Sequence, residues 1–124
     1  PVLHAILTAP ATSGFFAEGA RSEAAIAGTL AGIGPVQGRL DRLRITGDEI
    51  WLLDFKTGRR GGPAHESHIR QMAQYAALLR EAFPRRKVTA ALLWTQDMTL
   101  ENLSETALSR VLDGLRQERA AAPP

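Results

Sequence analysis

The stretch IWLLDFKTGRR, residues 50–60, decides both the fold and the chemistry that the sequence predicts. Its four leading apolar residues are typical of a buried β-strand, yet the run ends in Asp54 and, two positions later, Lys56. A carboxylate and an ammonium at the end of a buried strand lose solvation. This loss is destabilising unless a partner compensates it. The stretch therefore predicts a polar site where the strand ends, beside a loop rich in Gly and Arg.

The segment PVQGRLDRLRIT, residues 35–46, is a second strong strand pattern, and Gly47-Asp48 follows it as a two-residue hairpin turn. With Gly first, we expect a type II′ turn. This turn sets Asp41 directly opposite Asp54, with Cβ atoms about 4.5–5.5 Å apart, whereas a slip of one residue would turn Asp41 to the other face. The same register predicts, on the Asp54 face, Arg39 with Lys56, Leu43 with Leu52 and Ile45 with Ile50, and on the other face Leu40 with Phe55, Arg42 with Leu53 and Arg44 with Trp51.

Two opposed carboxylates destabilise each other, and burial increases the cost. A shared divalent cation removes this conflict, and Mg²⁺ prefers carboxylate oxygens while keeping several waters, one of which can be activated as a nucleophile. We expect Mg²⁺, with Mn²⁺ as a substitute, on Asp41 and Asp54, with the backbone carbonyl of Phe55 as a further oxygen ligand. Lys56 would stabilise charge on the attacking oxygen or the phosphate. The alternative for Asp54 and Lys56 is a pair of solvated charges at a strand end.

The remaining segments predict a small α/β fold. The mixed central sheet has an antiparallel hairpin at its core and helices on its faces, in the order α-β-β-β-α-β-α. The expected elements are a short helix before Pro10, a loop with an aromatic pair over 11–21, a weak strand over 22–28, a short strand or turn over 29–34, the hairpin, a loop over 58–67, a helix over 68–83 capped by Ser67 and stopped by Pro84, a buried strand over 87–95, and a helix over 104–120 capped by Ser104.

The composition narrows the class of protein. The 124 residues, 44% of them hydrophobic, suit one domain, expected over 1–119, with a disordered tail over 120–124, in what looks like a fragment of a larger protein. The absence of Cys excludes disulfides and thiolate metal sites. A net charge of +2 is too balanced to indicate nucleic acid by itself. No apolar run of about 18 residues and no signal-peptide pattern occur, so we expect a cytoplasmic protein with no membrane partner.

Three motifs occur in order: Gly38-Arg39-Leu40-Asp41-Arg42, then Asp54-Phe55-Lys56-Thr57, then Gln71-Met72-Ala73-Gln74-Tyr75. Together they resemble the PD-(D/E)xK nuclease superfamily and, more closely, its RecB-type nuclease module, which implies a restriction-endonuclease-like fold. The resemblance covers roughly residues 20–105. The segment looks most like the C-terminal nuclease domain of an AddA-type helicase–nuclease subunit.

The resemblance implies roles for five side chains. Asp41 and Asp54 would be metal ligands, Lys56 the catalytic lysine, and Gln71 and Tyr75 the helix motif beside the site. The spacing of the last two independently puts them on one helix face, although an ordinary exposed face is the alternative. Glu23 is a further candidate ligand, for which a strand-end Glu paired with an Arg is the competing interpretation.

Arginines near these motifs could contact the phosphate backbone, since Arg suits bidentate phosphate binding; each is otherwise a solvated surface charge. The candidates are Arg59, Arg60, Arg42 and Arg70. The family's upstream metal-binding His is expected outside this chain, because His4 does not match its pattern. His65 and His68 either approach phosphate or are surface residues.

These features predict a metal-dependent DNA nuclease of the exonuclease type, which hydrolyses phosphodiester bonds during double-strand break end processing for recombinational repair. The expected partners are linear DNA ends, single-stranded product strands and a partner helicase–nuclease subunit. The expected location is the nucleoid region of a bacterial cytoplasm. ATP would act only through helicase domains absent from this chain, which has no G-x-x-x-x-G-K-[ST] motif. Without the upstream His the fragment is expected to be poorly active. The alternatives are a stand-alone exonuclease or resolvase, and a catalytically incomplete module for DNA-end or subunit docking.

Overall fold

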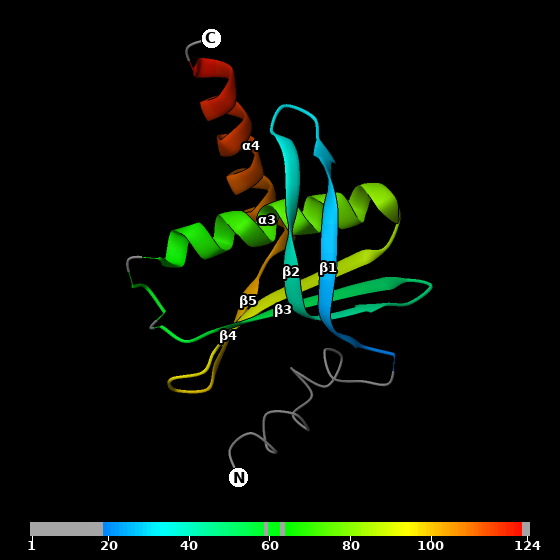
Figure 1. Ribbon diagram of the computed structural model, residues 1–124, viewed down its shortest axis with the longest axis vertical. Coiled ribbons are helices and arrows are strands. Elements are labelled where there is room, and N and C mark those ends of the chain that lie inside the picture. The colour runs from blue at the N-terminus through cyan, green and yellow to red at the C-terminus, as the bar shows by residue number, and fades with distance from the viewer. Residues whose placement is uncertain (1–18, 59, 63, 123–124) are drawn as a thin grey trace.

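The computed structural model describes residues 19–58, 60–62 and 64–122, which form a five-stranded sheet of order β1-β2-β3-β4-β5 with helices against it (Figure 1). The sheet is mixed, because β3 and β4 are parallel while the other neighbours are antiparallel. A parallel pair needs a long crossover, which α3 provides. The elements are β1 (Arg21–Leu30), β2 (Gly34–Ile45), β3 (Glu49–Lys56), α3 (His65–Ala82), β4 (Lys87–Trp94), β5 (Thr99–Leu103) and α4 (Glu105–Ala121). The predicted mixed α/β sheet is confirmed, but the predicted order is wrong in having one strand after the long helix, where the structure has β4 and β5.

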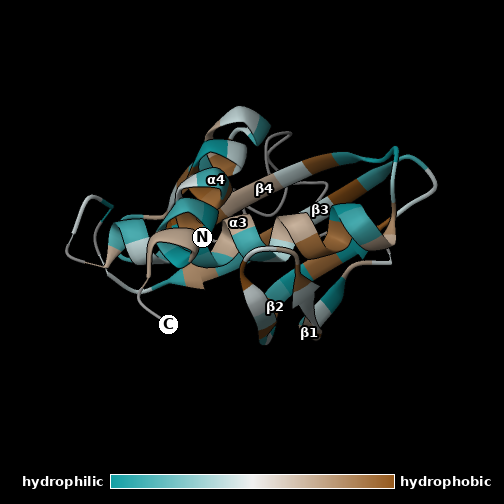
Figure 2. Cartoon of the chain, turned by 90° about the horizontal axis from the view of Figure 1, so that it is seen from above, coloured by the Kyte–Doolittle hydropathy of each residue, from teal (hydrophilic) through white to brown (hydrophobic). Residues whose placement is uncertain are grey.

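The main core lies between the sheet and α3. Its buried side chains include Leu40, Leu52 and Leu92 from the strands, with Met72 and Ala76 from the helix. Figure 2 shows hydrophobic stretches along β3 and β4, with mixed hydropathy along the two helices. In the described part of the chain, no helix is long and apolar enough to cross a membrane.

The hairpin register is as predicted, but the turn type is wrong. Ile45 pairs with Ile50 across the turn. Gly47 is not among the described glycines with positive φ, which a type II′ turn requires. Instead, the Thr46 hydroxyl accepts the Glu49 N–H at 2.9 Å, and the Thr46 carbonyl accepts from Arg86 Nε at 2.7 Å. A side-chain oxygen therefore satisfies the turn's amide.

Pairing between β2 and β3 stops at Arg42 and Leu53. In the described ladder, three predicted pairs beyond that point are missing: Asp41 with Asp54, Leu40 with Phe55, and Arg39 with Lys56. The last two predictions are wrong, whereas the aspartates meet through bonds from backbone amides to their carboxylates rather than as a ladder pair.

The reason is a bend that runs across two strands. Leu40 and Leu43 are both buried in the α3-facing core, so the inward positions of β2 change from even to odd between them. On β1, Glu23 has a φ of 51° and coincides with a gap in the β1–β2 pairing, opposite Asp41. Figure 1 shows β1 and β2 running steeply across β3 and β4. The bend separates β2 from the end of β3 and leaves room for side chains.

The helix ends test the predicted caps. Helix α3 begins at His65 with Ala64 as N-cap and no side-chain cap bond, so the prediction of Ser67 as cap is wrong. Backbone bonds from His65 N to Gly62 O and from His68 N to Ala64 O already close its first turn. The predicted stop before Pro84 and the Ser104 cap of α4 are confirmed.

Other boundaries differ in smaller ways. Helix α4 runs through Ala121, so residues 120 and 121 of the predicted tail are helical. Strand β1 extends to Leu30 before a turn, which settles the ambiguous segment over 29–34. The expected first helix and most of the loop with its aromatic pair lie outside the described residues.

Candidate active site

Asp41 and Asp54 meet where the β2–β3 ladder stops. The backbone N–H of Asp41 donates to Asp54 Oδ1 at 3.2 Å, and the backbone N–H of Phe55 donates to Asp41 Oδ2 at 2.7 Å. Each carboxylate thus bonds a backbone amide of the opposite strand. These bonds fix both side chains in one place, with Asp54 only 7% exposed.

Two carboxylates lie at this point, and the ammonium of Lys56 pairs with one of them, Asp54. Lys56 Nζ lies 2.7 Å from Asp54 Oδ2. Burial raises the pKa of Asp54 and the hydrogen bond with the Asp41 carboxyl raises it further, while Lys56 acts in the opposite direction; the net pKa shift is upward. The site therefore has more negative charge than its own cation balances.

Helix α3 closes the site from above the sheet. Gln71 Oε1 accepts from Lys56 Nζ at 3.4 Å, and Gln71 also hydrogen-bonds the Tyr75 side chain one turn later. Tyr75 is 2% exposed, and its pKa is raised by burial and by the Asp54 charge. Gly38 makes this fit possible, because an added Cβ would overlap the Tyr75 hydroxyl. The structure thus brings together all five side chains of the three motifs: Asp41, Asp54, Lys56, Gln71 and Tyr75.

Other candidates lie elsewhere. Glu23 is exposed and, among described side chains, lines a cavity of about 600 Å³ with Leu43, Ile45 and Phe83 rather than contacting either aspartate. Arg70 pairs with Glu118 and Glu66. Arg42 donates to Ser22 Oγ at 2.6 Å. Arg59 lies outside the described residues.

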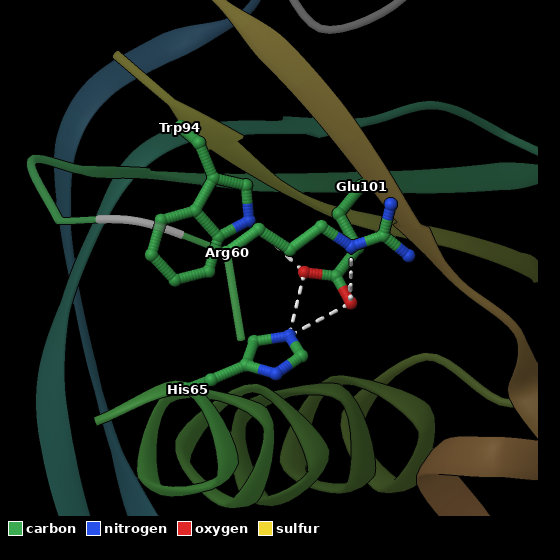
Figure 3. Close-up of polar contacts among 4 residues, drawn as sticks. All are labelled: Arg60, His65, Trp94 and Glu101. Carbon is green, nitrogen blue, oxygen red and sulfur yellow. Dashed lines mark hydrogen bonds and ion pairs between the residues drawn. The ribbon is translucent and has the colours of Figure 1, made fainter. Parts of the chain in front are cut away.

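A second polar cluster, which sequence reasoning missed, centres on Glu101 of β5 (Figure 3). Glu101 is 7% exposed and accepts from Trp94 Nε1 at 3.0 Å. His65 Nε2 lies 2.8 Å from Glu101 Oε1, and Arg60 Nε lies 3.6 Å from Oε2. The signal in the sequence was Glu101 in the short segment TLENL, a carboxylate directly after Leu100 and close to Leu103.

His68 lies beside Trp94 of this cluster, close enough to Lys56 to feel its charge. Its ring centroid is 5.9 Å from that of Trp94. Burial lowers the pKa of His68, and the charge of Lys56 lowers it further. An imidazole with a lowered pKa is neutral at physiological pH.

The aspartate pair fits a divalent cation. Mg²⁺ is commonly held by one or two carboxylates together with waters and substrate phosphates, and the excess negative charge around Asp54 is what such an ion would neutralise. Within the described residues, no group of three or more His, Cys, Asp or Glu side chains is placed to hold a metal. The two carboxylates would therefore form the protein's described share of the ligand set. The roles predicted for Glu23 and the Phe55 carbonyl stay predictions.

A titration of stability checks the raised pKa of Asp54. Because folding favours the protonated acid, the contribution of Asp54 to the unfolding free energy is fully present below its ordinary pKa of 3.8 and is lost as pH rises through the raised value. Asp54→Asn, which cannot ionise, should remove this loss. We expect the urea midpoint of the variant, measured in EDTA between about pH 4 and 8, to rise relative to that of the wild type as pH increases. A difference that does not change with pH would contradict the assignment.

Comparison with known proteins gives the same superfamily as the three motifs. The family model described as PD-(D/E)XK nuclease superfamily matches residues 5–122. The mixed sheet flanked by helices is consistent with the restriction-endonuclease-like fold predicted for the chain. No curated protein matches the chain. The solved structure named "Crystal structure of SSO0001" is similar with 17% identity and a TM-score of 0.46, over 99% of this chain and 57% of that one.

Proposed function

Because the chain belongs to the PD-(D/E)XK nuclease superfamily, we propose that it is a metal-dependent DNA nuclease domain that hydrolyses phosphodiester bonds. The observation that carries this proposal is the contact among Asp41, Asp54 and Lys56 at the bent end of β3. A structural ion pair would need one carboxylate for one ammonium. The second carboxylate is explained by a divalent cation that the site takes up from outside and that can in turn hold a phosphate.

Each side chain then has a task. Asp41 and Asp54 would hold Mg²⁺ or Mn²⁺ through oxygens fixed by backbone amides of the opposite strands. When bound, the ion would polarise the phosphate and make a nearby water more acidic. Lys56 would stabilise the charge that builds on the phosphate, since an ammonium fixed in advance needs little reorganisation. Gln71 would hold the Lys56 ammonium in place, and Tyr75 would hold Gln71.

Cleavage of end-labelled linear DNA by this chain tests the proposal. Cleavage is expected with Mg²⁺ or Mn²⁺ and none with EDTA, with single-stranded and double-stranded substrates compared side by side. A label at either end distinguishes release of terminal nucleotides, expected for an exonuclease, from internal cuts. Metal-dependent binding of DNA without any cleavage would instead support a catalytically incomplete docking module.

The wider role that we propose is end processing of double-strand breaks for recombinational repair, in an AddA-type helicase–nuclease. ATP would be consumed by helicase domains outside this chain, and the nuclease would receive single strands from them together with a partner subunit. The expected location is the nucleoid of a bacterial cytoplasm. The motif order from Gly38 through Tyr75 supports this context.

A further inference from the structure

The cluster around Glu101 is built as an anchor for the segment between β3 and α3. Figure 3 shows the carboxylate of Glu101 surrounded by Arg60, His65 and Trp94. His65 Nε2 lies 2.8 and 2.9 Å from its two oxygens, and Trp94 Nε1 donates at 3.0 Å. Since Glu101 is 7% exposed, these contacts compensate a buried charge. The loop and the first residue of α3 are thereby tied to the last strand of the sheet.

The orientation of Arg60 stands out within this anchor. Its nearest approach to Glu101 is through Nε, at 3.6 Å, and its side chain is 57% exposed. Figure 3 shows the two terminal nitrogens on the side of the guanidinium away from the carboxylate. In the part of the chain that the structure describes, Glu101 is the ion-pair partner of Arg60. The terminal nitrogens, which can donate in parallel to two oxygens of one phosphate, thus face outward.

The anchor lies beside the proposed reaction centre. Across the sheet, Asp54 pairs with Leu92, and Leu92 pairs with Glu101. Directly paired residues share a face, so Asp54 and Glu101 lie on the same side, two strand spacings or about 10 Å apart. A nucleic-acid strand that places one phosphate at Asp54 can therefore reach Arg60 with a neighbouring phosphate.

We infer that Glu101 is a positioning residue that holds Arg60 ready for a second phosphate of the same nucleic-acid strand, next to the phosphate that is cut. The inference rests on the proposed function and adds to it a phosphate-binding point outside the metal site. Glu101 itself does not touch the substrate; it orients the guanidinium and, through His65, the start of α3.

Binding of a fluorescent single-stranded oligonucleotide in EDTA, at several salt concentrations, tests this without catalysis. Arg60→Ala should weaken binding about tenfold and reduce the slope of log K against log salt by about 0.7, the amount for one phosphate contact. Arg110→Ala, on the exposed surface of α4, is the matched control and should change neither.

The Glu101→Gln variant distinguishes a positioning role of Glu101 from simple repulsion between its negative charge and DNA. Removing a negative charge near DNA would tighten binding if Glu101 acted only by repulsion. Positioning predicts weaker binding by about threefold or more, and no further loss in the Arg60→Ala background, since coupled residues are not additive. In the cleavage assay both variants should raise KM and leave kcat near the wild-type value.

If Glu101→Gln does not fold, Arg60→Lys decides. Lysine keeps the positive charge at this position but lacks the guanidinium, whose Nε is the atom that approaches Glu101. Weaker binding by about threefold supports the inference, and wild-type binding overturns it. Tighter binding by Glu101→Gln, or equal losses with and without Arg60, also overturns it. If the wild type shows no salt-dependent binding, the proposed function and this inference fall together; a wild type that binds and cuts while these variants match it overturns the inference alone.

Discussion

Asp54→Ala and Lys56→Ala are each expected to lower metal-dependent cleavage of linear DNA by on the order of 10²–10³-fold. Asp54 is tied to Asp41 through a backbone amide and to Lys56 at 2.7 Å, so either change removes part of one connected unit. The double variant should lose little more than the worse single variant, because residues that act together are not additive. Initial rates at saturating DNA and a fixed excess of Mn²⁺ give the comparison.

The same sheet offers matched controls at its other end. Asp48 lies in the β2–β3 turn, and Lys87 begins β4 opposite Glu49. Asp48→Ala and Lys87→Ala remove the same charges from exposed positions and should retain wild-type cleavage. Thermal unfolding must show all four variants folded at the assay temperature. Cleavage that persists in both Asp54→Ala and Lys56→Ala would mean that the reaction occurs elsewhere.

Local pattern was enough to predict the meeting of Asp41 and Asp54. A two-residue turn fixes register whatever its backbone type, so the prediction of a type II′ turn could be wrong while the two aspartates still meet, although through carboxylate-to-amide bonds and not as a ladder pair. The bend could not be predicted in this way. It depends on a positive φ at Glu23, a residue type that gives no such signal, and on core packing that turns both Leu40 and Leu43 toward α3.

The cluster around Glu101 was missed for a related reason. Strand β5 has only five residues, Thr99–Leu103, which is too short for a clear alternating pattern in the sequence. Trp94 lies in the same hairpin as Glu101, but His65 is 36 residues away from Glu101, so no spacing rule joins it to the cluster. The three motifs were predictable because each lies within a single element or hairpin; what connects elements across the sheet was not.

Gly38→Ala is expected to be the most damaging single methyl group that can be added near the site. Its Cβ would overlap the Tyr75 hydroxyl and lie 2.7 Å from Tyr75 Cζ. Tyr75 is 2% exposed and packed in the core, so its ring cannot move without disturbing its neighbours. We expect the unfolding free energy to fall by about 1–3 kcal/mol, as in overpacked cores. Cleavage should fall too, because a displaced Tyr75 no longer supports Gln71.

Gly28→Ala is the matched control for this steric effect. Neither glycine is among those with positive φ, so alanine suits both backbones and only the space beside the new methyl group differs. At Gly28 the Cβ would meet Leu78 Cδ2 at 2.7 Å, the end of a side chain that can rotate, so the loss should stay under about 1 kcal/mol. Adding Tyr75→Phe to Gly38→Ala removes the overlapping oxygen. Urea unfolding of the double variant should therefore show less than the sum of the single losses; strict additivity would mean that Gly38 is not where Tyr75 is held.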